Sequence, residues 1–284
     1  MALSGLKTKL IAESNSSRTE WCLVENGEVV ERAYTEGLNP FFMSRREISH
    51  SIRLELPDAF FKRRWEHVYF YGAGCGTLDK KSMVEASLVA QFKTPSTVFS
   101  DLEGAARGLL VREPGLACII GNGSNSCLYD GERIVKNVRP LGFILGDEGS
   151  GSALGRLFVG DCLKNIAPHE VAQAFYEEYK LTPDAIMSSI YNNPQASRNL
   201  TQYSFFLAKH LDNGYVRELV WNEFMRFFVR NVSQYPYKDY DVSIVGSVAS
   251  CYSEMLLSVA RKFGVRVKKI IRDSMPGLII YHSL

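Results

Sequence analysis

Two short polar loops in similar settings constrain the fold of this 284-residue chain more than any other feature. Residues 14–19 and residues 121–126 are rich in Ser, Asn and Gly, and each loop lies between two apolar runs. Each second apolar run then reaches a further turn, Asn26-Gly27 in one case and Asp130-Gly131 in the other. The pattern predicts one strand–turn–strand–turn–strand unit that the chain uses twice.

Length and composition predict two globular domains. The 284 residues are 46% hydrophobic and 23% charged, which is typical of a protein with proper cores. Pro114-Gly115 is the best candidate boundary, so we expect domains over 1–112 and 113–284. A terminal helix at about 274–284 is expected to pack back on the N-terminal domain.

The pattern of apolar residues predicts alternating strands and helices. Strands are expected at 8–13, 20–25, 28–35, 67–71, 96–100, 116–121, 124–129, 132–138, 242–245 and 265–271. Helices are expected at 44–56, 79–92, 102–111, 150–163 and 246–263, in a block over 168–231, and at 276–281. This order predicts an α/β layer fold in which ligands lie beyond the carboxyl ends of the strands.

Charge and cysteine usage argue against several function classes. The net charge is +2 with scattered basic residues, so no nucleic-acid partner is expected. The 6 cysteines are dispersed without a Cys-x-x-Cys pair, which disfavours a zinc site. Without a signal-peptide core or an apolar run of membrane-spanning length, we expect a cytoplasmic protein with no membrane partner.

The paired loops suggest phosphate binding. Small residues let backbone N–H groups and hydroxyls converge on an anion, and the planar guanidinium of Arg18 suits phosphate oxygens. The alternative for either loop is an ordinary hairpin turn. Because two similar loops occur, we favour nucleotide phosphate.

Three other places could carry chemistry. Asp147 and Glu148 stand among glycines before a helix, where they could serve the helix N-terminus, ligand hydroxyls or a hydrated magnesium ion. Asp101 follows a strand and could be a general base or a helix cap. Gly246-Ser247 lies at a strand-to-helix junction, which suits either a ligand or a plain turn. The 5 histidines have no Ser or Cys partner at a recognised spacing, so a catalytic triad is not expected.

These residues together resemble the sugar kinase, Hsp70 and actin superfamily. More closely, the chain is similar to bacterial N-acetylglucosamine kinase-like proteins of the BadF/BadG/BcrA/BcrD ATPase group, over nearly its whole length. The matching segments are 13–22, Gly37-Leu38-Asn39-Pro40-Phe41, Tyr69-Phe70-Tyr71-Gly72-Ala73-Gly74-Cys75, Gly123-Ser124-Asn125-Ser126 and Pro140-Leu141-Gly142-Phe143-Ile144-Leu145-Gly146-Asp147-Glu148-Gly149-Ser150-Gly151. The resemblance implies two ribonuclease H-like (actin-like ATPase) domains facing an interdomain cleft.

The resemblance also implies an activity and a set of site residues. It implies a homodimeric kinase that uses ATP and Mg2+ to phosphorylate an amino sugar. The favoured substrate is N-acetylglucosamine, phosphorylated at its 6-hydroxyl, and the alternatives are N-acetylmuramic acid and glucosamine. Asp101 would be the catalytic base. The sugar would be contacted by Asn39, Asp101, Asn125, Gly142 and Asp147. The ATP phosphates would be held by Ser14, Asn15, Ser16, Ser17, Arg18, Thr19, Gly121, Asn122, Gly123 and Ser124. Gly246 and Ser247 would line the adenosine side, and Glu13 would hold the metal.

The first loop departs from the family pattern, which usually reads Asp-x-Gly-x-Thr-Lys-Thr-Asp. Glu13, Asn15 and Arg18 replace the Asp, Gly and Lys of that pattern, and Asn122 replaces a usual Thr in the second loop. One alternative is therefore a sugar-binding relative with weak or no phosphoryl transfer. Another is an ATPase that activates a redox protein, but the scattered cysteines argue against the iron–sulfur cluster that it would need.

Overall fold

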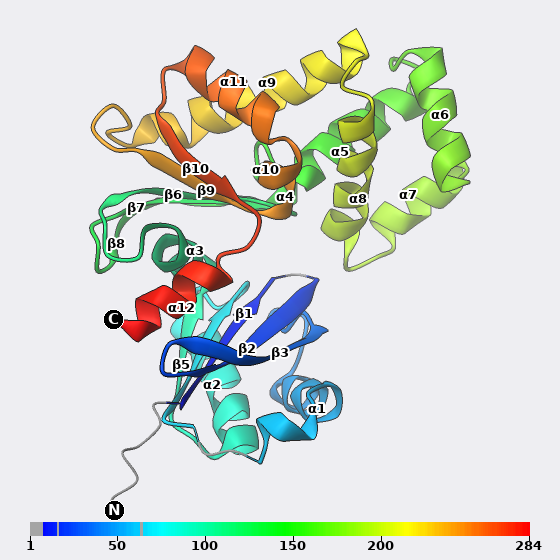
Figure 1. The fold of residues 1–284 in the computed structure, drawn as a ribbon. Helices are drawn as coiled ribbons and strands as arrows, with labels where there is room; N and C mark the ends of the chain where they lie inside the picture. Colours follow the sequence, from blue (N-terminus) through cyan, green and yellow to red (C-terminus); the bar gives the residue numbers. More distant parts are fainter. Residues whose placement is uncertain (1–7, 16, 63–64) are drawn as a thin grey trace, which may run out of the picture. The chain divides into compact units, whose positions relative to one another are not determined.

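The computed structural model describes residues 8–15, 17–62 and 65–284. The chain divides into two compact units (Figure 1). Unit 1 comprises Met1–Glu113 together with Ser274–Leu284, and unit 2 comprises Pro114–Asp273. Within the described ranges, no helix is long and apolar enough to cross a membrane.

Unit 1 is built on a five-stranded sheet of order β3-β2-β1-β4-β5. Its strands are β1 (Thr8–Ser14), β2 (Arg18–Glu25), β3 (Glu28–Glu36), β4 (His67–Gly72) and β5 (Ser96–Ser100). Its helices are α1 (Arg45–Glu55), the short 3-10 helix η1 (Asp58–Phe60), α2 (Leu78–Phe92), α3 (Asp101–Leu110) and α12 (Met275–Ser283). The first three strands form an antiparallel meander, and β4 and β5 continue the sheet parallel to β1.

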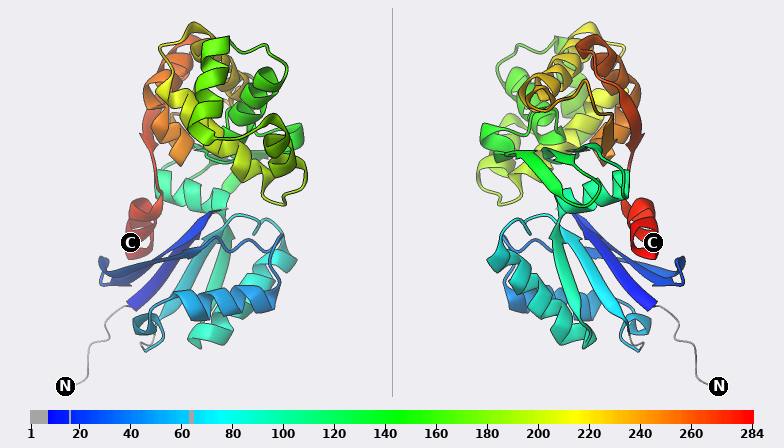
Figure 2. Two further views of the ribbon diagram at one scale, coloured as in Figure 1. Left: turned by 90° about the vertical axis from the view of Figure 1, so that its right-hand side faces the viewer. Right: turned by 90° about the vertical axis from the view of Figure 1, so that its left-hand side faces the viewer.

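Alternating side chains of β1 separate two cores in unit 1. Leu10 and Ala12 pack with residues of α1 and α2, including Ile48 and Val84. Ile11 points to the other face and packs with residues of the terminal helix α12. The period of two along the strand therefore places helices on both faces of the sheet (Figure 2).

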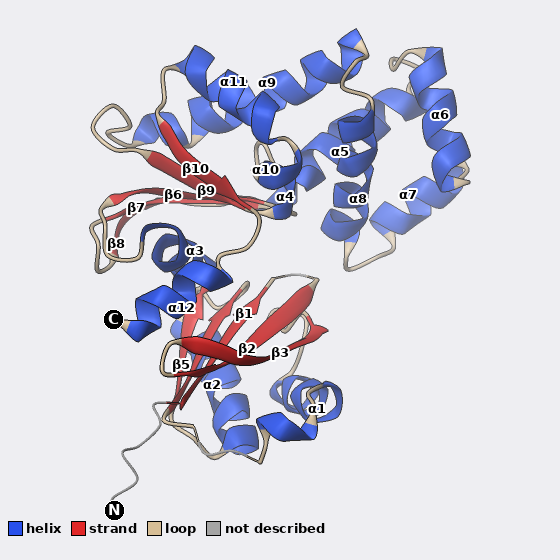
Figure 3. Cartoon of the chain, viewed as in Figure 1, coloured by secondary structure: helices blue, strands red, loops and turns tan. Residues whose placement is uncertain are grey.

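Unit 2 repeats this plan with a sheet of order β10-β9-β6-β7-β8. Its strands are β6 (Gly115–Ile120), β7 (Ser124–Tyr129), β8 (Ile134–Val138), β9 (Val242–Val245) and β10 (Val267–Ile271). Its helices are α4 (Gly142–Leu145), α5 (Gly151–Leu163), α6 (His169–Tyr179), α7 (Pro183–Tyr191), α8 (Ala196–Lys209), α9 (Gly214–Arg230), the 3-10 helix η2 (Val232–Gln234), α10 (Ser247–Cys251) and α11 (Ser253–Phe263). Figure 3 shows the strands of both sheets in red and the helices in blue.

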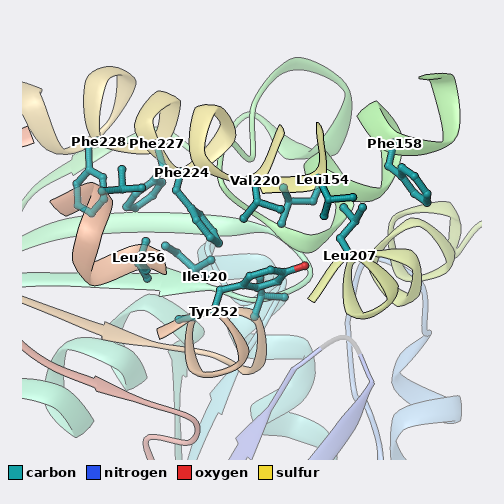
Figure 4. Close-up of a cluster of buried hydrophobic side chains, with 14 of the residues drawn as sticks. Ile120, Leu154, Phe158, Leu207, Val220, Phe224, Phe227, Phe228, Tyr252 and Leu256 are labelled. Atoms are coloured by element: carbon teal, nitrogen blue, oxygen red, sulfur yellow. The ribbon is translucent and has the colours of Figure 1, made fainter. Parts of the chain in front are cut away.

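Helix α9 supplies much of the core of unit 2. Its Phe224, Phe227 and Phe228 are buried in the cluster that also holds Leu154 of α5 and Tyr252 (Figure 4). The apolar face of α9 thus packs against the core of unit 2. This packing places Phe227 of α9 beside Gly149, in the loop that precedes α5.

Local sequence signals explain several helix ends. Ser44 and Glu47 form a capping box at α1, and the helix ends before Pro57. The single helix predicted over 246–263 is wrong, because Tyr252 separates α10 from α11. The Tyr252 backbone, with φ of −108° and ψ of 25°, departs from the helical conformation, and its buried side chain donates its hydroxyl to the Ser204 carbonyl.

Helix α12 approaches α3 closely enough to require glycine. A Cβ on Gly277 would lie 1.8 Å from the Gly108 carbonyl oxygen. We expect Gly277→Ala to destabilise the protein by about 1–3 kcal/mol, because backbone rather than a flexible side chain must move. Thermal unfolding followed by circular dichroism measures the change.

Gly160→Ala in α5 is the matched control, because a Cβ there meets no atom within 4 Å. This variant should gain roughly 0.5–1 kcal/mol from the higher helix propensity of Ala. Equal stability of the two variants would show that the α3–α12 contact can relax.

Candidate functional site

The first loop, between β1 and β2, is held by hydrogen bonds from its own backbone to the side chain of Asn15. The Asn15 side-chain oxygen accepts the backbone N–H of Ser17 at 2.8 Å and that of Arg18 at 3.0 Å. The Arg18 guanidinium carbon lies 5.0 Å from the ring centre of Tyr34. Ser16, a predicted phosphate contact, lies outside the described residues. Two N–H groups that could serve an anion are thus bonded to Asn15.

Two other residues predicted to hold phosphate, Ser14 and Thr19, are buried. Their hydroxyl oxygens lie 2.8 Å apart. Ser14 Oγ also accepts the Leu38 N–H at 2.9 Å, and Thr19 Oγ1 lies 2.8 Å from the Glu36 carbonyl oxygen. These hydroxyls therefore tie the strand ends to the segment after β3. Asn15 and Arg18 are the exposed residues among those described in this loop.

Glu13, the predicted metal ligand, lies near the end of β1 and is half-buried. Its carboxylate accepts a hydrogen bond from the Ser274 hydroxyl at the start of α12. Among the residues that the structure describes, no group of three His, Cys, Asp or Glu side chains gathers around a metal-sized point. A magnesium ion at Glu13 would therefore need water and phosphate oxygens for its other ligands, which is the usual arrangement for this ion.

The sugar-side candidates of unit 1 lie on a loop and at a helix start. The Asn39 side-chain oxygen accepts the Phe41 N–H at 2.9 Å, and Gly74 makes room for it, since a Cβ there would meet that oxygen at 2.3 Å. Asp101 is the first residue of α3, directly after β5, and its Oδ1 accepts the Leu102 N–H at 2.9 Å. Both placements match strand ends, where α/β folds bind ligands.

In unit 2, the second loop is joined to the start of α5. The Gly121 carbonyl accepts the Gly151 N–H at 2.9 Å, and the Asn122 carbonyl accepts the Ser152 N–H at 3.2 Å. The Gly121 N–H donates to the Gly123 carbonyl at 2.9 Å, and the space beside the Gly121 Cα is open, because a Cβ there would meet no atom within 4 Å. This openness suits the close approach of a phosphate group to the main chain.

Asp147 lies against the same loop. Its backbone is left-handed, with φ of 56°, and its carboxylate accepts the Ser124 N–H at 3.3 Å. A Cβ on Gly123 would meet that carboxylate at 2.8 Å, so a side chain there would displace it. Burial raises the pKa of Asp147 to about 6, the charge of Glu148 acts in the same direction, and the Ser124 N–H opposes the shift.

The remaining candidates surround this loop or flank it. The Asn125 side-chain oxygen accepts Asn137 Nδ2 at 2.9 Å, and Gly142 begins α4 with φ of 75°. Gly246, with φ of 141°, packs against the end of β6, where a Cβ would lie 2.2 Å from the Ile120 carbonyl oxygen. Ser247 follows it as the first residue of α10. The structure thus brings Gly246 beside the second loop, as sequence alone could not establish.

Sequence reasoning missed Arg230 and Glu223, which support the loop before α5. Glu148 forms an ion pair with Arg230, while Gly149 donates to Glu223 at 3.2 Å. Glu223 is a carboxylate on the apolar face of α9, beside Val220 and Phe227 in helical spacing. A charged residue on such a face is a signal that could have been noticed.

No family model and no curated protein matches the chain. Among solved structures, a candidate N-acetylglucosamine kinase from Porphyromonas gingivalis is 43% identical, with 96% of this chain and 98% of that chain covered and a TM-score of 0.92.

Two further structures share the fold at low identity. A candidate N-acetylglucosamine kinase from Chromobacterium violaceum is 13% identical, with 97% of this chain and 99% of that chain covered and a TM-score of 0.70. A ROK hexokinase from Thermus thermophilus is 12% identical, with 96% of each chain covered and a TM-score of 0.51.

The two sheets and these likenesses define a protein of the actin-like ATPase fold, as the sequence predicted. At 43% identity over nearly the full length of both chains, it belongs to the family of the Porphyromonas gingivalis protein, the N-acetylglucosamine kinase-like sugar kinases.

The raised pKa of Asp147 predicts a pH-dependent effect on stability. The folded protein holds this proton up to about pH 6, above the value of about 3.9 expected for the unfolded chain. Stability should therefore fall as pH rises through this window, and Asp147→Asn should escape that fall. The variant should gain up to about 3 kcal/mol over the native protein between pH 4 and pH 7.

Urea unfolding of both proteins across this pH range measures the difference, and other titrating groups cancel because both share them. Parallel profiles would show that burial does not perturb this carboxyl.

Proposed function

We propose that this protein transfers the γ-phosphoryl group of ATP to the 6-hydroxyl of N-acetylglucosamine. The observation that carries the proposal is the 43% identity to the candidate N-acetylglucosamine kinase from Porphyromonas gingivalis, over 96% of this chain. At the level of class, the protein is a sugar kinase, a phosphotransferase that acts on an alcohol group.

In unit 2, Asp147 and Asn125 are proposed to hold the sugar, with Gly142 beside them. The Asp147 carboxylate has a pKa of about 6, so it is mostly ionised at neutral pH and can accept hydrogen bonds from sugar hydroxyls. The left-handed backbone at Asp147 supports this role, because strained positions cluster at ligand sites.

In unit 1, Asp101 is proposed to take the proton of the attacking hydroxyl, and Asn39 to contact the sugar. Asp101 follows β5 and starts α3, so its backbone is held by regular structure on both sides. The helix N-terminus favours its negative charge before proton transfer. Proton acceptance by a placed carboxylate contributes roughly a hundredfold to ten-thousandfold in rate.

The nucleotide side of the proposal uses both polar loops. Bound ATP with Mg2+ would supply the phosphoryl group and neutralise its developing charge. Glu13 would hold the metal through water, and Arg18 would face phosphate oxygens from the first loop. The open space beside the Gly121 Cα, with Gly246 packed near it, supports phosphate and adenosine binding in unit 2.

The proposal is tested by ADP release from the purified protein with ATP, Mg2+ and a panel of sugars. We expect the highest kcat/KM with N-acetylglucosamine, and lower values with N-acetylmuramic acid, glucosamine and glucose. Phosphorus NMR of the product identifies the phosphorylated hydroxyl. Sugar binding by calorimetry with no ADP above background would contradict the kinase and favour a sugar-binding relative.

Asp101→Asn is the internal control of this assay. It should lower kcat by roughly a hundredfold or more while the sugar still binds. Asp58→Asn, an exposed residue of the same unit on η1, should leave kcat unchanged. Unchanged turnover in Asp101→Asn would remove the base from the proposed mechanism.

The closed first loop predicts an effect on ATP. Asn15→Gly frees the N–H groups of Ser17 and Arg18, which the Asn15 side chain now occupies. We expect KM for ATP to fall about threefold to tenfold, since each freed donor can bond a phosphate oxygen at the strength of a charge-assisted hydrogen bond. Steady-state kinetics at saturating sugar measures it.

Ser188→Gly, on the exposed surface of α7, controls for the flexibility of glycine. A higher KM for ATP in Asn15→Gly would show that the side chain organises the loop for phosphate.

A further inference from the structure

The loop that carries Asp147 is held from two sides. On one side, the Asp147 carboxylate and the Glu148 carbonyl accept hydrogen bonds from the N–H and the hydroxyl of Ser124, at 3.3 and 2.8 Å. On the other side lies α9, which contributes Glu223 and Arg230. Asp147 therefore sits between the second polar loop and one helix.

The contact through Glu223 is the more buried of the two from α9. The Glu223 residue is 1% exposed, and its Oε1 accepts the Gly149 N–H at 3.2 Å. Its Oε2 accepts from the Arg226 guanidinium at 3.2 Å, and that side chain is 49% exposed. A buried carboxylate on an apolar helix face carries a desolvation cost, which the Gly149 N–H and Arg226 offset.

A residue with a side chain could not replace Gly149 without a shift of the backbone. Its φ of 76° is left-handed, and a Cβ there would lie 2.8 Å from Cβ of Phe227 on α9. The backbone at 149 is thus pressed against the same helix that supplies Glu223. Because Asp147 is two residues away and also left-handed, the direction of its carboxylate depends on where Gly149 is held.

We propose that Glu223 is a positioning residue for the sugar site: by accepting the Gly149 N–H, it fixes the loop that aims the Asp147 carboxylate at the sugar. The inference rests on the proposed function, since it assigns Asp147 to the sugar. Glu223 itself touches no substrate. Its acceptor oxygen, rather than its charge, does the positioning, because the ion pair with Arg226 lies within α9 and does not reach the loop, whereas Oε1 accepts the Gly149 N–H.

Two variants separate the acceptor from the charge. Glu223→Asp keeps the charge, but its carboxylate withdraws by roughly 1 Å and leaves hydrogen-bond range of Gly149. Glu223→Gln loses the charge but keeps an oxygen at the same reach. We expect Glu223→Asp to raise KM for the amino sugar about tenfold or more, as loss of an orienting contact does elsewhere. Glu223→Gln should stay within about threefold of the native value.

Hydrogen–deuterium exchange provides a readout that needs no catalysis. The peptide spanning 146–152 should exchange faster in Glu223→Asp than in the native protein, and at the native rate in Glu223→Gln. KM for ATP should stay unchanged in both. Glu218→Asp and Glu218→Gln are matched controls, because Glu218 is exposed on the same helix; both should behave as the native protein.

The outcomes are distinguishable. If the native protein phosphorylates amino sugar but Glu223→Asp shows native KM and native exchange, the inference is wrong. If Glu223→Gln is impaired as much as Glu223→Asp, charge and not the acceptor matters, which also overturns it. If the native protein phosphorylates no sugar, the proposed function fails, and faster exchange confined to Glu223→Asp still supports the loop contact. Should Glu223→Asp not fold, Glu223→Met, which also lacks the acceptor, replaces it.

Discussion

A half-buried carboxylate on a left-handed backbone links the loops of unit 2. Asp147 has a left-handed conformation, its carboxylate occupies the space that Gly123 leaves, and its oxygen accepts the Ser124 N–H. Burial of this group is unfavourable for its charged form, as its raised pKa of about 6 indicates. Such a group persists only where the surrounding structure over-determines it. The second loop and α9 provide that surrounding structure, so the packing of the unit and the proposed chemistry share the same residues.

The two units use the same sheet plan but different loops. In both, a meander of three antiparallel strands continues into two parallel strands. The loop of unit 2 is bonded through its carbonyls to the start of α5, its Gly121 N–H donates to the Gly123 carbonyl, and the space beside the Gly121 Cα is open. The loop of unit 1 directs its N–H groups to the side chain of Asn15. The repeat in the sequence therefore specifies two similar hairpins, while single residues decide what each loop can bind.

Local patterns predicted much of the fold and part of the site. The strands, the Ser44 capping box and the position of Asp101 after a strand follow from residues close together in sequence. The contacts of Tyr252 and Glu223 do not, because their partners lie 48 and 74 residues away. A charged side chain on an apolar helix face, such as Glu223 on α9, indicates that the charged group has a buried partner. Its partner is known only once the chain has folded.

The contacts of Glu13 show that packing as well as chemistry can constrain a residue of the proposed site. The family pattern has the shorter Asp there, which would withdraw the carboxylate by roughly 1 Å. In this chain the longer side chain bonds the Ser274 hydroxyl, 261 residues away in sequence. Ser274 also packs against Gly108 of α3, at the point where α12 joins unit 1. The identity of residue 13 is therefore coupled to the terminal helix, and replacing Glu13 by the family's Asp would alter that contact together with any metal site.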